Sequence, residues 1–477
     1  MTCNRPGRDL LPSRAMRPAV WHLAAWRTIA ALALFAAAPL RADAPSKDAV
    51  VTTAFVHVNV LPMDAEHVLR DQTVIVENGR ITAIGPELRV PPKARVVDGH
   101  GTAFLSPGLA DMHTHADTRN DLAVYLANGV TTVLNMGEAS PGFIARDRRR
   151  ANAGEIPGPH VYAAFMVDGS PQYGHFVVTT GEEARALVRL ARTNGYDFIK
   201  VYNNLSPECF EALADEGKRR HMPIVGHGVT AVGLERQLDA GQVLVAHTEE
   251  FMYTTFADPD APPDAAPDAA AIPRAIEFVR RDRAFVTADL NTYATIARQW
   301  GRPDVVGQFL HMRQTRYLSP DRRIAWKNEG YARRKGSLDA RLTFLKRFTR
   351  ELADAGIPLV TGTDAPAIPG LVPGFSLHDD LRALEDAGLS RYQALAAATR
   401  TSGEFIARSI DDAVPFGTIE PGRRADLVLS AANPLDDLAT LREPLGVMAN
   451  GRWYPKEELD ALLENVAAAY EAVSLRP

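Results

Sequence analysis

Six chemically reactive side chains stand at the ends of short apolar runs, in a fixed order along the chain. They are His113, His115, Lys200, His227, His247 and Asp364. Each apolar run has the length and composition of a β-strand. His113 and His115 occupy positions i and i+2, so on a strand both imidazoles point to one face and can reach one metal ion. The chain therefore needs a fold that gathers the ends of several strands at one place.

The later members of this set follow one another at regular intervals. The stretches from Lys200 to His227 and from His227 to His247 each have room for one strand and one helix. Alternating strands and helices predict a parallel α/β fold, and eight strands match a closed barrel with its active site at the C-terminal strand ends. The expected strands are 105–113, 131–136, 160–165, 198–202, 223–227, 243–247, 285–290 and 358–363.

Both ends of the chain are rich in short β-strands. Near the N-terminus the expected strands are 54–60, 73–77 and 80–84, and Asn78-Gly79 predicts a hairpin turn between the last two. Near the C-terminus they are 417–419, 425–429 and 447–453. We divide the chain into a leader at 1–44, a β-rich part at 45–106, the barrel at 107–410, and a second β-rich part with a terminal helix at 411–477.

The sequence around the six residues resembles the amidohydrolase superfamily. The form of the motif with a lysine after the fourth strand resembles one branch of that superfamily. This branch holds prolidase-like dipeptidases, ochratoxinase-like amidases and imidazolonepropionase-related proteins. The resemblance runs from about residue 50 to residue 454, and its motifs are 104–115, 197–202, 223–227, 245–247 and 360–364. It implies an α/β fold, a (β/α)8 TIM barrel, beside which the two chain ends join into one small β-sandwich.

The resemblance also implies a centre with two divalent metal ions, expected to be zinc. Neutral imidazole nitrogens of His113 and His115 suit zinc or a similar cation, and His227 and His247 would complete the second site. An ammonium group cannot ligate a cation, but a buried lysine loses its proton readily. In relatives this lysine becomes a carbamate that bridges two metals, as expected for Lys200. The alternative is a salt-bridged core lysine beside a single metal.

Asp364 is the expected general base. At the end of the last strand it can bind the first metal, accept the proton of the attacking water and pass it to the leaving nitrogen. The alternative is a helix cap, because the chain turns there into Ala365-Pro366.

Further residues are expected to bind the substrate or to orient ligands. Tyr202 lies two positions beyond Lys200, and prolidase-like relatives use a tyrosine there to contact the substrate carboxylate. His175, in the loop after the third strand, is the second substrate-binding candidate, although both side chains could instead serve packing. Glu249 and Glu250 follow His247 and are expected to orient a ligand.

These features predict an exported, metal-dependent amidohydrolase that cleaves the amide C–N bond of a dipeptide or N-acyl amino acid. Hydrolysis of a cyclic amide or a lactone is the alternative. A further alternative, from a different functional class, is a barrel that binds a ligand without catalysis. A small-molecule substrate and a homo-oligomer are expected. The formal net charge of −5 argues against a nucleic-acid surface.

The N-terminus reads as a secretory signal. Arg14, Arg17 and Arg27 precede the apolar run 29–38, and Ala42-Asp-Ala44 fits a cleavage site. The run is shorter than the roughly 20 residues that cross a bilayer, so we expect no stable anchor after cleavage; an uncleaved anchor is the alternative. The expected location is periplasmic or secreted. Cleavage removes Cys3 and leaves Cys209, so the mature chain has no internal disulfide.

Two segments interrupt the alternation of strands and helices. The stretch 257–271 is rich in Asp, Pro and Ala and is expected to be a loop after the sixth strand. The stretch 299–336 is expected to be a polar, partly helical insertion. Both follow the C-terminal ends of strands, so either segment can cover the active site or form a surface insertion without a role.

Overall fold

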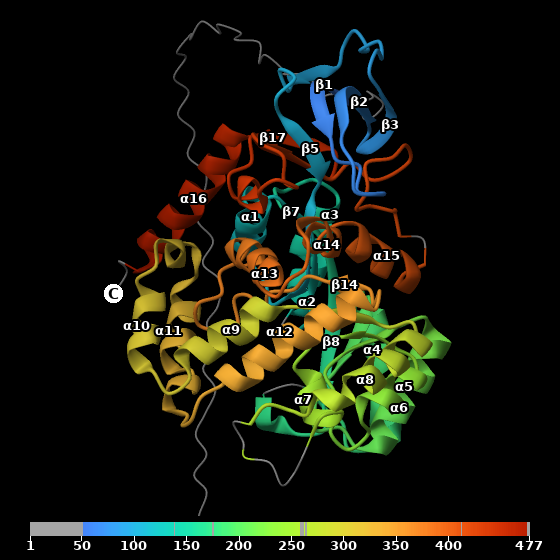
Figure 1. Ribbon diagram of the computed structural model, residues 1–477, viewed down its shortest axis with the longest axis vertical. Coiled ribbons are helices and arrows are strands. Elements are labelled where there is room, and N and C mark those ends of the chain that lie inside the picture. The colour runs from blue at the N-terminus through green and yellow to red at the C-terminus, as the bar shows by residue number, and fades with distance from the viewer. Residues whose placement is uncertain are drawn as a thin grey trace, which may run out of the picture. The chain divides into compact units, whose positions relative to one another are not determined.

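Eight parallel strands follow one another around a nearly closed barrel (Figure 1). Each hydrogen-bonded neighbour pair along this sheet is parallel. The computed structural model describes residues 51–137, 139–173, 176–257, 262, 265–411 and 413–474. The barrel strands are β6 (Leu109–Thr114), β7 (Val130–Asn135), β8 (His160–Asp168), β10 (Phe198–Val201), β11 (Ile224–Gly226), β12 (Gln242–Val245), β13 (Phe285–Thr287) and β14 (Leu359–Val360), and a short β9 (Phe176–Val177) pairs with β8. The predicted α/β barrel is confirmed.

The barrel closes where the chain leaves β14 and runs beside β6. The Met112 amide donates to the Thr361 carbonyl at 2.9 Å, and the Asp364 amide donates to the His113 carbonyl at 2.8 Å. These bonds satisfy backbone groups that an open sheet edge would leave unpaired. They also fix Asp364 next to His113, although the two residues are far apart in the sequence.

The first expected strand, 105–113, is in fact two strands that belong to different sheets. β5 (Phe104–Pro107) pairs with strands from both chain ends, and β6 begins the barrel. Gly108 connects them at a close approach to β7, because a Cβ at this position would lie 2.2 Å from Thr131 Oγ1. The glycine therefore lets the chain pass from one sheet into the other against a packed neighbour.

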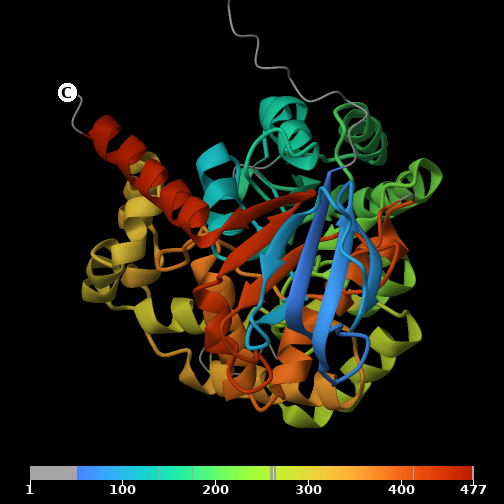
Figure 2. The ribbon, with the colours of Figure 1, turned by 90° about the horizontal axis from the view of Figure 1, so that it is seen from above.

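Strands from the two chain ends lie side by side in one mixed sheet, as predicted (Figure 2). A turn at Asn78-Gly79 joins two of them, with positive φ at both residues as such hairpins require. The expected strand at 417–419 is wrong: no strand forms there, and the Ile419 amide donates to the Pro62 carbonyl outside any ladder. The sheet order is β17 (Arg452–Pro455), β16 (Gly446–Ala449), β15 (Leu427–Ser430), β5, β1 (Thr52–Val60), β2 (Leu69–Glu77) and β3 (Arg80–Gly85), with β4 (Arg95–Asp98) paired to β1.

Helices connect the barrel strands and carry the predicted insertion. The insertion is partly helical, as expected, and buried Trp326 anchors it by donating from Nε1 to the Pro366 carbonyl at 2.8 Å. The insertion therefore packs against the loop that follows β14. The helices are α1 (Arg119–Ala127), α2 (Pro141–Phe143), α3 (Arg149–Asn152), α4 (Gly181–Thr193), α5 (Pro207–Arg220), α6 (Leu234–Asp239), α7 (Glu250–Thr254), α8 (Ile272–Arg281), α9 (Leu290–Gln299), α10 (Pro303–Leu310), α11 (Pro320–Asn328), α12 (Asp339–Asp354), α13 (Phe375–Asp386), α14 (Arg391–Ala397), α15 (Arg400–Ser409) and α16 (Lys456–Ser474).

Some predictions concern residues outside the described part of the chain. The leader at 1–44 lies outside it, as do 258–261 and 263–264 in the loop after β12. Within the residues that the structure does describe, no helix combines the length and the apolar composition needed to cross a membrane. Cys209 is buried in α5.

Candidate metal centre and active site

The barrel brings all six predicted ligands to one end of its strands. Their positions follow from the fold: His113 lies within β6, Lys200 within β10, and the other four just beyond the ends of β6, β11, β12 and β14. Five of the six are buried as whole residues, and the Asp364 side chain is 15% exposed. Parallel strands place their C-terminal ends at the same mouth of the barrel, so residues distant in sequence meet there.

Asp364 lies between His113 and His115. Its Oδ1 is 2.8 Å from His115 Nε2 and 3.3 Å from His113 Nε2. Burial alone would raise the pKa of Asp364, but the neighbouring histidines outweigh burial and hold this pKa well below its usual range. The carboxylate is therefore an ionised acceptor that faces the imidazole nitrogens.

The remaining ligands continue from His113 in a row. Lys200 Nζ lies 3.1 Å from His113 Nε2. The ring centroids of His113 and His247 are 4.3 Å apart, and those of His247 and His227 are 5.1 Å apart. Lys200 thus contacts one imidazole of the cluster and interacts electrostatically with that of His227.

Buried carboxylates lie behind two of the histidines. His227 Nδ1 contacts Glu250 Oε1, and His247 Nδ1 lies 2.5 Å from Asp289 Oδ2. An ionised carboxylate can only accept a hydrogen bond, so each Nδ1 donates to its carboxylate and each Nε2 is the ring atom left to face a ligand. Glu250 thus contacts a histidine as expected, whereas sequence reasoning missed Asp289. The same signal points to Asp289, because this residue closely follows the apolar run of β13.

Asp111 is a second residue that sequence reasoning missed. It is fully buried in β6, its Oδ1 accepts from the His113 amide at 3.2 Å, and its Oδ2 accepts from Thr363 Oγ1 at 2.6 Å. Burial raises the pKa of Asp111 to about 8. These bonds join β6 to the segment after β14 and hold His113 and Asp364 in register.

The donor atoms of this cluster fit divalent cations. Ligand atoms of His113, His115 and Asp364 lie within 4.8 Å of one another, and so do those of His113, His247 and Asp289. His115 Nδ1 is buried and has no hydrogen-bond partner among the described residues. The ring therefore makes its polar contact through Nε2, with Asp364. Imidazole nitrogens with one or two carboxylates are the ligands that zinc and similar cations prefer.

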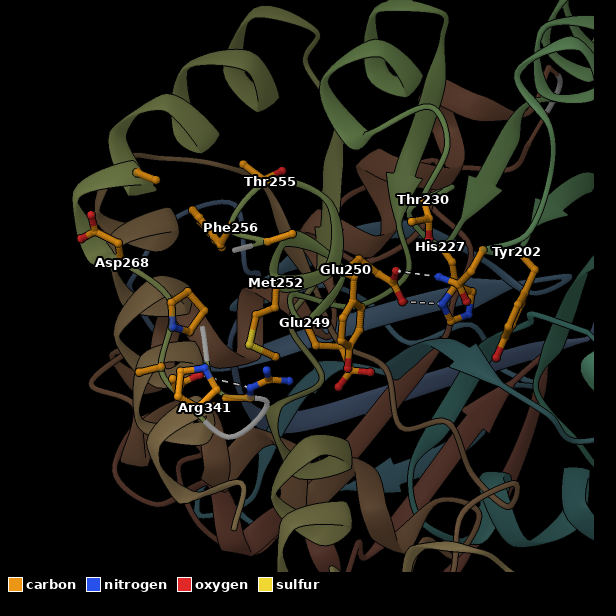
Figure 3. A pocket seen from close by; sticks show the side chains of 18 of the residues that line it. Tyr202, His227, Thr230, Glu249, Glu250, Met252, Thr255, Phe256, Asp268 and Arg341 are labelled. Atoms are coloured by element: carbon orange, nitrogen blue, oxygen red, sulfur yellow. Dashed lines mark hydrogen bonds and ion pairs between the residues drawn. The ribbon is translucent and has the colours of Figure 1, made fainter. Parts of the chain in front are cut away.

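A cavity of about 890 Å³ opens beside the cluster (Figure 3). Tyr202, His227, Glu249 and Glu250 are among its lining residues. The Tyr202 ring centroid is 4.1 Å from that of His227, so this predicted substrate-binding residue lies next to a predicted metal ligand. The other candidate, His175, lies outside the described residues. The insertion contributes Tyr331 to the cavity lining, so this segment does border the site.

Comparisons with known proteins agree with this geometry. The sequence profile described as Amidohydrolase family matches residues 104–454. Ochratoxinase from Aspergillus niger is 23% identical in an alignment that covers 85% of this chain and 86% of that protein. A putative prolidase from Bifidobacterium longum has a TM-score of 0.63 and 24% identity, covering 87% of this chain and 99% of that one. A Xaa-Pro dipeptidase with bound methionine has a TM-score of 0.62 and 18% identity, covering 85% and 100%.

Proposed function

The chain belongs to the amidohydrolase family, and from this premise we propose that it hydrolyses the amide bond of a dipeptide or an N-acyl amino acid. Family membership makes it a hydrolase that acts on C–N bonds. The finer assignment is supported by likeness to a protein called ochratoxinase and to structures called prolidase and Xaa-Pro dipeptidase. We propose that the substrate of this chain is a linear amide beside a free carboxylate.

The observation that carries the proposal is the convergence of the six predicted ligand residues on one barrel mouth, with a cavity beside them. We assign His113, His115 and Asp364 to a first divalent metal ion, and His227 and His247 to a second. Lys200, as a carbamate, would contact both, and zinc is the expected metal. When bound, such ions lower the pKa of water and polarise the scissile carbonyl.

The protein residues supply the remaining steps. Asp364 presents an ionised oxygen at the cluster, takes the proton of the attacking water on that oxygen and returns it to the leaving nitrogen. Tyr202 stands beside His227 at the cavity end, where its hydroxyl can donate to the substrate carboxylate. Asp289 and Glu250 hold the two outer histidines in the orientation and tautomer that ligation requires.

We also propose that the mature chain acts in the periplasm or outside the cell. The support is the run of arginines, the apolar stretch and the Ala42-Asp-Ala44 motif near the N-terminus. N-terminal sequencing of the protein recovered from a periplasmic fraction tests this, and a chain that retains its leader in the cytoplasmic fraction contradicts it.

The function is tested with the purified chain after loading with zinc. N-acyl amino acids and dipeptides form the main panel, and a cyclic amide and a lactone represent the alternative substrates. We expect hydrolysis of at least one linear amide, with loss of activity in a chelator and recovery after zinc is added back. Turnover confined to the cyclic amide or the lactone, or activity that survives removal of all metal, contradicts the proposal.

A further inference from the structure

The cavity beside the metal cluster extends to a single arginine. Arg341 belongs to the first turn of α12, and no other Arg or Lys side chain lines this cavity among the residues that the structure describes. In Figure 3, Tyr202 and His227 lie at one end of the cavity and Arg341 lies toward the other. The cavity thus has a metal end and a cationic end.

In the part of the chain that the structure describes, no carboxylate pairs with Arg341. Its Nε donates to the Ala265 carbonyl at 3.3 Å, and its side chain hydrogen-bonds to Tyr293. A guanidinium has five N–H donors, so these two bonds leave donors for a ligand. Asp268, which also lines the cavity, points away from Arg341 (Figure 3), and within the described ranges no acidic group lies within 4.0 Å of the guanidinium.

Aromatic packing fixes the position of Arg341. The Phe256 ring packs edge-on against Phe344 and Phe348 of α12, with centroid distances of 5.1 and 5.2 Å. Phe251 of α7 packs against Phe348 in the same way, at 5.0 Å. These contacts hold the start of α12 against the chain that follows His247, so Arg341 is placed relative to the metal cluster by a rigid core.

The wall between the two ends includes the apolar side chains of Met252 and Phe256 beside the polar side chain of Thr255 (Figure 3). The acidic lining residues Glu249 and Glu250 interact electrostatically with His247. A ligand that fills this cavity would meet the metal cluster first, then an apolar wall, then a guanidinium. The volume of about 890 Å³ lies within the range of sites for small organic molecules.

We propose that Arg341 binds a carboxylate at the end of the substrate remote from the scissile amide. The preferred substrates are therefore amides that carry a second carboxylate, separated from the reacting bond by an apolar spacer. Planar guanidinium and carboxylate groups pair with two parallel hydrogen bonds, which gives both charge and shape recognition. This inference rests on the proposed function and specifies its substrate class.

The test compares two pairs of amides that differ only in the remote group. N-glutaryl-L-phenylalanine and N-glutaramoyl-L-phenylalanine place a carboxylate or a carboxamide on the acyl side, and N-acetyl-L-glutamate and N-acetyl-L-glutamine place it on the amine side. For zinc-loaded wild type we expect kcat/KM to favour the carboxylate in one pair by about 10- to 100-fold, as for hydrogen bonds to charged groups.

Three variants assign this preference to the arginine. Arg341→Gln should reduce the ratio of kcat/KM values to below about threefold. Arg341→Lys should keep part of the ratio, because the ammonium group keeps the positive charge but cannot form the two parallel hydrogen bonds of a guanidinium. Arg347→Gln is the matched control on the same helix: Arg347 is 61% exposed, pairs with Glu351 at 2.7 Å, and should leave the ratio unchanged.

The results separate this inference from the proposed function. Wild-type ratios near one in both pairs, or an Arg341→Gln enzyme that keeps the wild-type ratio, overturn the role of Arg341 even though amides are hydrolysed. If no amide is hydrolysed, the proposed function fails, and calorimetry with glutarate then tests the subsite directly. Equal glutarate affinity in wild type and Arg341→Gln overturns the subsite, and at least about tenfold weaker binding in the variant supports it.

Discussion

His247 Nδ1 lies 2.5 Å from Asp289 Oδ2, and both side chains are buried. The two residues come from the loops after β12 and β13, which are neighbours in the barrel. Burial alone would lower the pKa of His247, but the Asp289 carboxylate outweighs it and raises the pKa to about 10. The pair therefore fixes the proton on Nδ1, and Nε2 becomes a ligand atom once a cation replaces its proton.

We expect Asp289→Asn to weaken metal binding. The amide has nearly the same shape, but it lacks the charge that fixes the tautomer and increases the basicity of His247. Loss of such a partner typically costs 10- to 100-fold in metal affinity. Competition with a chelator measures the affinity, and Asp354→Asn, on the exposed face of α12, is the control. Unchanged metal affinity in Asp289→Asn would show that the pair has only a structural role.

Lys200 is expected to act as a carbamate. The side chain is buried and its Nζ is 3.1 Å from His113 Nε2, so an ammonium would place positive charge beside a metal ligand. Reaction of the neutral amine with carbon dioxide gives a carbamate and one proton, which reverses the local charge. Lys200→Ala should therefore lose most of one metal ion and nearly all turnover, with partial recovery in short carboxylic acids.

The carbamate itself can be observed. After incubation with zinc and ¹³C-bicarbonate, wild type should show a carbamate carbon signal that is absent from Lys200→Ala. Full metal content and activity in Lys200→Ala, or no such signal in active wild type, would contradict the assignment.

Gly108 is expected to be essential for stability. In Gly108→Ala the new methyl would lie 2.2 Å from Thr131 Oγ1, and Thr131 is a short side chain rooted in β7 that cannot move far. We expect a loss of about 3 kcal/mol, the upper end of the usual range for overpacking. Thr131→Ala should recover part of this loss in the double variant. Gly307→Ala in α10, where nothing lies within 4 Å, should be neutral or slightly stabilising. Urea unfolding compares the four proteins.

Local signals made the barrel and its ligands predictable. Each ligand follows an apolar run, and period-two alternation placed His113 and His115 on one face. The split at Gly108 was not predictable in the same way, because it depends on Thr131, a residue on another strand. The segment 417–419 has strand-like residues, yet Gly417 has φ of +90° and its missing Cβ leaves room for the Thr399 carbonyl. Tertiary contacts decided both cases.

The second layer of the site was harder to predict than the first. Asp289 lies just beyond a strand end and Asp111 lies within β6, but nothing local shows that they contact His247 and Thr363. Arg341 is harder still, since it belongs to a helix after the insertion and reaches the cavity only through the packing of α12. Such residues are defined by three-dimensional neighbours, which sequence spacing does not encode.

The contribution of His378 to stability is expected to fall in mild acid. Burial lowers the pKa of His378 to about 4, whereas an unfolded chain has a histidine pKa of about 6.5. Between these values the unfolded state binds a proton that the folded state does not, so stability decreases as pH falls. The contribution from pH 7 to pH 5 is about 2 kcal/mol at most.

A variant isolates the contribution of His378. His378→Gln keeps a donor for the Asn128 carbonyl, which Nε2 contacts at 2.9 Å, and removes the titration. Its unfolding free energy should therefore change less between pH 7 and pH 5 than that of wild type. His100→Gln, at a side chain 79% exposed, is the control. Parallel pH profiles of wild type and His378→Gln would refute the explanation.

Asp364→Asn separates metal binding from proton transfer. The backbone of Asp364 has a φ of +57°, a left-handed conformation that asparagine adopts more readily than most residues, so this substitution adds little strain. The amide still offers one oxygen to the metal, but it cannot accept the proton of the attacking water. Loss of a general base typically costs 100- to 10,000-fold in rate.

We expect Asp364→Asn to keep the fold and most of the metal, to keep KM within about tenfold, and to lose at least about 100-fold in kcat. Metal analysis and steady-state kinetics on one preparation decide the matter, since near-normal kcat with full metal would leave Asp364 as a ligand or a cap and move the proton transfer to another group.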